Sequence, residues 1–166
     1  MKPQEFCGAF SLSVMQRKYD ILISYSRSDV DFADDLYRAL ELQGLHVWMD
    51  RTSIPQSSEW EEKIWRALRE SAFMLLIISQ ASMDSQPVKD EIATAINLKT
   101  PIWWVKIEEP SPDTFVPLRL QRLNGKVVLG DRSQDKLQEI VRDARAVLNE
   151  VQPAPTTPKQ EANISV

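Results

Sequence analysis

The sequence predicts an α/β fold, an open parallel sheet of five strands with helices on both faces. Short apolar runs without apolar/polar alternation, such as 21–23 and 72–78, are typical of strands buried on both faces. Amphipathic segments of helical period lie between these runs, so that strands and helices alternate along the chain. Because parallel strands need a crossover connection, this alternation predicts a doubly wound, flavodoxin-like sheet.

The first half of the chain contains two strand–helix pairs. Its elements are expected at 21–23 (strand), 28–43 (helix, capped by Ser28 or Asp29), 45–50 (strand), 51–58 (polar loop) and 59–70 (helix). Each helix has apolar residues three or four positions apart, the spacing of one buried face. These are Phe32, Leu36, Ala39 and Leu40 in the first helix and Trp60, Ile64, Ala67 and Leu68 in the second. Gly44 is the expected stop of the first helix.

The second half continues the alternation and then becomes irregular. Its elements are expected at 73–79 (strand), 81–87 (loop), 88–98 (helix), 101–107 (strand), 126–129 (strand) and a last helix capped by Ser133. A proline-rich connection precedes the fifth strand. The last helix has the same apolar spacing, in Leu137, Ile140, Val141, Ala144 and Leu148.

Length and composition indicate one globular domain at residues 18–151. A chain of 166 residues with 43% apolar residues can bury a sizeable core. Residues 1–17 are expected to be a disordered leader. From Gln152 the composition shifts to Pro, Thr, Gln and Asn, which cannot form a core. Residues 152–166 are therefore expected to be a disordered tail, or a linker to a further effector or sensor domain.

Composition also excludes several classes of function. A net charge of -4 argues against nucleic-acid binding, and no apolar run approaches the ~20 residues that span a bilayer. Cys7 and His46 are the only cysteine and histidine, which excludes an internal disulfide, a Cys/His zinc site and a Cys–His nucleophile pair. The chain has neither GxGxxG nor GxxxxGK[ST]. We expect a cytoplasmic protein with no metal, no cofactor and no membrane contact.

Candidate site residues lie where the strands end. In open α/β sheets ligands bind at the carboxyl ends of the strands. Tyr25, Ser26 and Arg27 follow the first strand, and Asp50 follows the second. Arg27 is either a solvated loop charge or a ligand for a phosphate, and Asp50 is either a turn former or a site acid.

Glu91 is the most informative position. It shares one helix face with Val88, Ile92 and Ala95, so it is an acid on an otherwise apolar stripe. Such a residue is either a structural acid that favours the helix dipole or pairs with a base, or a site carboxylate beside the strand ends. Trp60 has two possible interpretations, either as a core residue or as an aromatic surface on which a ligand stacks.

Several motifs together resemble a Toll/interleukin-1 receptor (TIR) domain of bacterial type. The resemblance is carried by Tyr-Asp-Ile-Leu-Ile-Ser-Tyr-Ser-Arg-Ser-Asp (19–29), Gly-Leu-His-Val-Trp-Met-Asp (44–50), Trp-Glu-Glu-Lys-Ile-Trp-Arg-Ala-Leu-Arg-Glu-Ser (60–71) and Ser85-x-x-Val88-x-x-Glu91. It covers 19–107 in register and extends more weakly to the end of the last helix. Each motif alone is moderately specific, and their order and spacing are strongly specific.

The resemblance implies one of two activities. Many bacterial and plant TIR domains cleave the bond between nicotinamide and ribose in NAD, which gives nicotinamide and ADP-ribose or a cyclic ADP-ribose product. Their required glutamate maps onto Glu91. This implies an NAD nucleosidase in prokaryotic defence or virulence signalling. The alternative is a non-catalytic adaptor that acts through TIR–TIR association, although adaptor-type members usually lack the glutamate.

The resemblance also implies roles for other residues. The residues expected to bind NAD are Tyr25, Ser26, Arg27, Trp48, Asp50, Trp60 and Ser85. The long loop after the second strand mediates self-association in the family, and here it contains Arg51, Ile54 and Pro55. The sequence departs from the family pattern at Pro87, where many catalytic members have an aromatic, and at Ser57, where a glycine is usual.

A two-component receiver shares the predicted topology but not the residues. A receiver requires an Asp at the end of the third strand, where this chain has Ser79, and an acidic pair after the first strand, which is missing. The sequence therefore leaves the enzyme and the adaptor as the two functions to distinguish.

Overall fold

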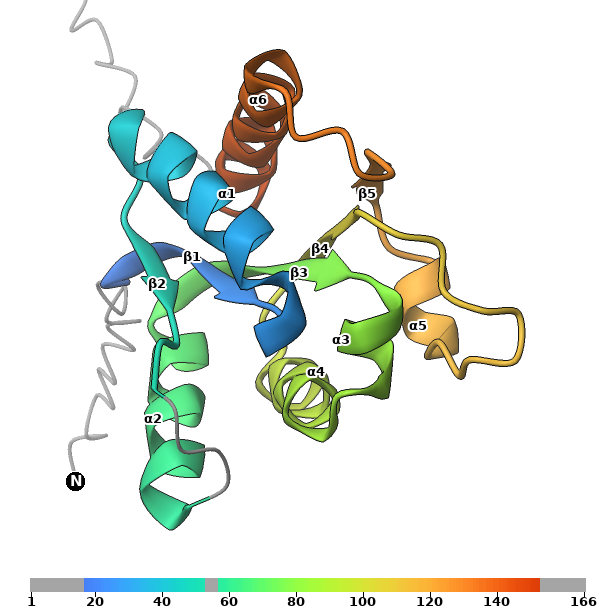
Figure 1. Ribbon diagram of the computed structural model, residues 1–166. Coiled ribbons are helices and arrows are strands. Elements are labelled where there is room, and N and C mark those ends of the chain that lie inside the picture. Colours follow the sequence, from blue (N-terminus) through green and yellow to red (C-terminus); the bar gives the residue numbers. More distant parts are fainter. Residues whose placement is uncertain (1–16, 53–56, 153–166) are drawn as a thin grey trace, which may run out of the picture.

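The computed structural model describes residues 17–52 and 57–152, which contain a single parallel sheet (Figure 1). Its strands are β1 (Tyr19–Ser24), β2 (Val47–Met49), β3 (Ser71–Ile78), β4 (Ile102–Lys106) and β5 (Gly125–Val127), in the order β2-β1-β3-β4-β5. All four neighbouring pairs are parallel. The predicted five-stranded parallel α/β sheet is confirmed.

Helices cover both faces of the sheet, as Figure 1 shows. One face is covered by α1 (Val30–Leu42) and α6 (Gln134–Val151), and the other by α2 (Ser58–Arg69) and α4 (Gln86–Leu98). Three short helices complete the described part, namely the 3₁₀ turn η1 (Arg27–Asp29), α3 (Gln80–Asp84) and α5 (Leu118–Gln121). No helix among the described residues is long and apolar enough to cross a membrane.

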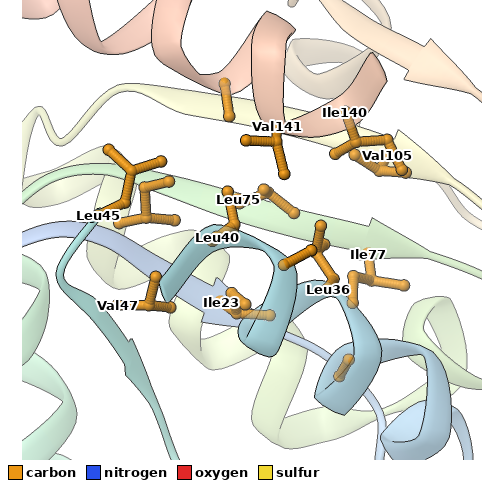
Figure 2. Packing of buried hydrophobic residues seen from close by; sticks show 14 of the residues in the cluster. Ile23, Leu36, Leu40, Leu45, Val47, Leu75, Ile77, Val105, Ile140 and Val141 are labelled. Atoms are coloured by element: carbon orange, nitrogen blue, oxygen red, sulfur yellow. The ribbon is translucent and has the colours of Figure 1, made fainter. Parts of the chain in front are cut away.

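The alternation of side chains along each strand divides the core in two. On β1, Ile21 and Ile23 pack with α1 and α6, whereas Leu22 packs with α2 and α4. Figure 2 shows the first of these clusters, in which Leu36 and Leu40 of α1 lie beneath Ile140 and Val141 of α6. All eight residues of β3 are buried, as expected for the central strand of a sheet covered on both faces.

Most element boundaries differ from those predicted by one or more residues, and three of the differences have a clear local cause. The expected loop 81–87 contains α3, because Ser79 and Ser82 cap its first turn reciprocally, with N···Oγ distances of 3.0 and 2.8 Å. The second strand is shorter than 45–50 because the Leu45 N–H bonds back to the Leu40 carbonyl of α1. The fifth strand ends before Leu129, whose φ of 39° is incompatible with a strand. The helix α5 was also not predicted; it lies in the proline-rich connection.

The two terminal segments predicted to be disordered lie almost entirely outside the residues that the structure describes. The expected disordered leader was 1–17 and the expected tail was 152–166, and the structure describes only Arg17 and Gln152 of these segments. The predicted domain at 18–151 stays a prediction from composition.

Position 125, in the edge strand β5, has room only for a glycine because the Trp104 ring lies against its backbone. A Cβ atom at this position would lie 2.0 Å from Cδ2 of Trp104 on the neighbouring strand β4. We expect Gly125→Ala to lower the free energy of unfolding by about 1–3 kcal/mol, because the indole must leave its rotamer. Urea denaturation measures the change.

Trp104→Ala provides the control for this contact. If the clash with the ring causes the loss, Gly125→Ala should cost much less in the Trp104→Ala background, since the two positions then act non-additively. Equal costs in the two backgrounds would contradict the explanation.

Candidate active site

The carboxyl ends of β1 and β2 direct two polar side chains toward α2 and α4. Leu22 and Trp48 pack on that face of the sheet, and residues two positions further along a strand share the face. These residues are Ser24, the last residue of β1, and Asp50, directly after β2. Both are buried, and both find partners on the helices that cover this face.

Glu91 in the second turn of α4 faces the end of β1. The residue is 8% exposed, and its Oε2 accepts a hydrogen bond from Oγ of Ser24, 67 positions away in the sequence. Burial raises the pKa of Glu91 to about 7, against the opposing effect of the Ser24 hydrogen bond. The charge of Asp50 raises the pKa further and that of Arg27 lowers it. Glu91 therefore changes its protonation state near neutral pH.

Asp50 organises the hydrogen bonds at the end of β2. Its Oδ2 accepts from Nε1 of Trp60 at 2.9 Å and from Nη2 of Arg27 at 3.1 Å, and its Oδ1 accepts from the N–H and the hydroxyl of Thr52 at 3.1 and 2.7 Å. Nζ of Lys63 lies 3.5 Å from the same Oδ1. Burial alone would raise the pKa of Asp50, but the hydrogen bonds from Thr52 and Trp60 and the charge of Lys63 outweigh it and lower the pKa. Asp50 is thus a fixed negative charge at neutral pH.

Tyr25 differs from the expectation of a loop residue open to a ligand. It is 9% exposed, and its ring belongs to the core under α1 and α6. Its hydroxyl donates to the Asp50 carbonyl at 2.8 Å. The reason is again the alternation of the strand, because Tyr25 follows Ile23 on the opposite face from Ser24.

Arg27 is half exposed, but its guanidinium is already engaged by the protein. Nη1 donates to the Tyr25 hydroxyl at 2.9 Å and to the Asp50 carbonyl at 2.8 Å, and Nη2 donates to the Asp50 carboxylate. Arg27 therefore joins the loop after β1 to the end of β2. The role of Arg27 as a ligand for a phosphate stays a prediction.

A hollow of about 570 Å³ lies between α2 and α4 and reaches Glu91. Trp60 and Trp65 of α2 contribute aromatic surface to it, and Glu61, Glu62, Asp90 and Glu91 give it an acidic lining. Ligand pockets typically have volumes of about 300–1,000 Å³. Trp60 packs in the core with Ile64 and also lines this hollow, and its role as a surface on which a ligand stacks stays a prediction.

Other predicted site residues lie elsewhere or have structural partners. Trp48 lines a separate hollow of about 330 Å³ on the other flank of α2. Ser26 caps η1 by accepting from the Ser28 N–H at 3.3 Å, and Ser85 caps α4 by accepting from the Val88 N–H at 3.5 Å. Arg51 pairs with Asp34 of α1 at 2.7 Å. Ile54 and Pro55 of the predicted assembly loop lie outside the described residues.

Sequence reasoning missed three polar residues of this site, Ser24, Thr52 and Lys63. Ser24 could have been found from the strand period, because a serine on the buried face after Leu22 requires a hydrogen-bond partner. Lys63 is a half-exposed residue of α2 outside its apolar stripe, and no local sequence pattern connects it with Asp50. Within residues 17–52 and 57–152, no cluster of three or more His, Cys, Asp and Glu side chains could hold a metal ion.

Comparisons with solved structures agree with this architecture. The TIR domain of the Toll-related receptor TRR-2 from Hydra magnipapillata superimposes with a TM-score of 0.58 at 20% identity, over 76% of this chain and 98% of that one. The heterodimer of the RPS4 and RRS1 TIR domains gives 0.56 at 15% identity, over 77% and 96%. A diflavin flavoprotein from Nostoc sp. gives 0.51 at 9% identity, over 80% and 92%. At these identities the likeness shows the fold.

Sequence comparison identifies the family. No curated protein matched the chain significantly. The family described as the TIR domain matches residues 21–141, which include β2 to β5, all of β1 but its first two residues, and both Asp50 and Glu91. The chain therefore belongs to the TIR domain family.

Proposed function

We propose that this TIR domain cleaves the nicotinamide–ribose bond of NAD, with Glu91 as the catalytic residue. The observation that supports it most is Glu91 itself, a buried carboxylate at a hollow. Among the described residues its hydrogen-bond donor is a serine and not a basic side chain. A purely structural acid in such a place would normally be paired with a base. Perturbed pKa values of this kind gather at functional sites.

The reaction needs little from the protein beyond this carboxylate. Nicotinamide in NAD already carries a positive charge, so it leaves as a neutral molecule without acid catalysis. The bond to the ribose C1′ breaks with its electron pair going to nicotinamide, and an oxocarbenium-like ribose results. A carboxylate held against the ribose stabilises this charge, as in glycosidases. Water then adds to C1′ and loses a proton to give ADP-ribose, or an adenine nitrogen adds to give a cyclic product.

The hollow between α2 and α4 suits the nicotinamide riboside end of the substrate. Its acidic residues favour a cationic ring, and the partly exposed indole of Trp65 offers a face on which such a ring can stack. The diphosphate would be repelled by the same acids, so we propose that it extends out of the hollow toward solvent.

Incubation with NAD tests the proposal directly. We expect the purified protein to release nicotinamide, followed by chromatography, together with ADP-ribose or its cyclic form. A protein that releases no nicotinamide at any concentration but forms TIR–TIR complexes would instead be the non-catalytic adaptor.

Self-association through the loop after β2 is a further prediction. The RPS4 and RRS1 TIR domains form a heterodimer, which makes assembly a reasonable proposal for this chain. Ile54 and Pro55 are the apolar residues of the loop sequence and would anchor a partner. If a neighbouring copy completes the site, specific activity rises with protein concentration and Ile54→Asp abolishes the rise.

Leu42→Asp is a matched control for this test. Leu42 is an exposed apolar residue at the end of α1 and belongs to no part of the site. Its substitution should leave the concentration dependence unchanged. Specific activity independent of concentration, in a protein that is monomeric by light scattering, would contradict the prediction.

A further inference from the structure

We infer that Ser24 is a positioning residue for the reaction proposed above: its hydroxyl fixes the Glu91 carboxylate and favours the ionised form. Ser24 is the last residue of β1, and it is 1% exposed. Its Oγ donates to Oε2 of Glu91. A hydroxyl that donates to a carboxylate stabilises the charged state, and a charge-assisted bond is stronger than a neutral one.

The position of Ser24 makes it a rigid support. Its backbone lies in the sheet in register with Leu76 of the fully buried strand β3. The serine side chain has a single χ angle, so the hydroxyl has little freedom to leave the carboxylate. Glu91 is held by α4, whose N-terminus is capped by Ser85. The hydrogen bond thus connects two elements that are each fixed by packing.

The charges around Glu91 explain why the single hydroxyl of Ser24 influences the ionisation of this carboxyl group. From the end of β2, Asp50 disfavours ionisation of Glu91, and Asp90 on the same helix acts in the same direction. Arg27 after β1 opposes them, but its guanidinium is bound to Asp50. Glu61 and Glu62 of α2 add acidic side chains to the same hollow. In such surroundings the Ser24 hydrogen bond is a direct contact that favours the carboxylate.

The pH dependence of NAD cleavage is the first test. Wild-type kcat/KM should rise with pH through a midpoint near the Glu91 pKa of about 7, because the carboxylate is the active form. For Ser24→Ala we expect the midpoint to move up by about one pH unit, since a lost hydrogen bond to a charged group corresponds to a shift of this size. A variant with lower activity but an unchanged midpoint would overturn the inference.

Ser71→Ala is the matched control. Ser71 is also a buried strand serine, but its hydroxyl donates to the Ala67 carbonyl at 2.6 Å, at the opposite end of the sheet. Its removal should leave the midpoint where it is in the wild type. An equal shift in Ser71→Ala would mean that loss of any buried hydroxyl moves the profile, and would overturn the inference.

Carboxyl ¹³C NMR of protein labelled at glutamate measures the titration of the Glu91 carboxyl group in the absence of substrate. Glu91→Gln identifies the signal, and Ser24→Ala should raise its titration midpoint. If Ser24→Ala does not fold, the near-isosteric Ser24→Cys, a much weaker donor, should give the same direction of shift. Identical midpoints in wild type and variant would overturn the inference, whereas a shifted midpoint in a protein that releases no nicotinamide would overturn the proposed function alone.

Discussion

Glu91→Gln is expected to lower the rate of NAD cleavage by about 100- to 1,000-fold, the usual effect of removing one group that stabilises charge in a transition state. The amide has the size and hydrogen-bonding capacity of the acid, so its oxygen can still accept from Ser24. What is lost is the negative charge beside the developing ribose cation. Nicotinamide release under saturating NAD measures the loss in kcat.

Glu150→Gln is the control for this variant. It makes the same change at an exposed position of α6, on the other face of the sheet, and should retain wild-type turnover. Turnover by Glu91→Gln at the wild-type rate would show that Glu91 is not catalytic.

The same substitution has a predictable effect on stability. The folded-state pKa of Glu91, about 7, lies above its ordinary value of 4.5, so the folded protein binds a proton that the unfolded chain releases. Ionisation therefore costs stability progressively as the pH rises from 4.5 to 7, and the full penalty, at most about 3 kcal/mol, persists above that range. Glu91→Gln is expected to be more stable than the wild type above pH 7, and this advantage disappears on acidification. Thermal unfolding followed by circular dichroism tests this sign.

Trp60→Ala is the second large effect that we expect. The indole is 7% exposed and packs with Ile64 and Leu68 of the core under α2 and α4, so its truncation should cost roughly 3–5 kcal/mol of unfolding free energy. Asp50 also loses the N–H donor at 2.9 Å and is left as a less satisfied buried charge. Urea denaturation followed by circular dichroism measures the change.

Two other variants separate the contributions to this effect. Trp60→Phe retains most of the packing and removes only the N–H, so it should cost about 1–3 kcal/mol. Trp65→Ala makes the same truncation on the same helix at a residue that is 42% exposed, and should cost much less than Trp60→Ala. Similar losses at Trp60 and Trp65 would contradict the burial argument.

The sequence by itself determined the fold and the elements that carry the site. Apolar runs and helical stripes are local patterns, and each reports the burial of one segment whatever its neighbours are. They predicted the five strands, the four long helices and the placing of Glu91 on a buried stripe. They were weakest where capping or backbone geometry decides a boundary, as at Ser79, Leu45 and Leu129, because a single hydrogen bond or a left-handed residue ends an element there.

Only the tertiary structure decided which of the candidate residues meet. The strand period separates Ser24 from Tyr25, so one faces α4 and the other enters the core under α1 and α6. Trp48 shares a strand face with Asp50 but lies on the other flank of α2 from Glu91. These outcomes depend on how helices pack against the sheet, and residues 67 positions apart, such as Ser24 and Glu91, have no local pattern that joins them. The hydrogen bond between Ser24 and Glu91 is therefore a property of the packed fold.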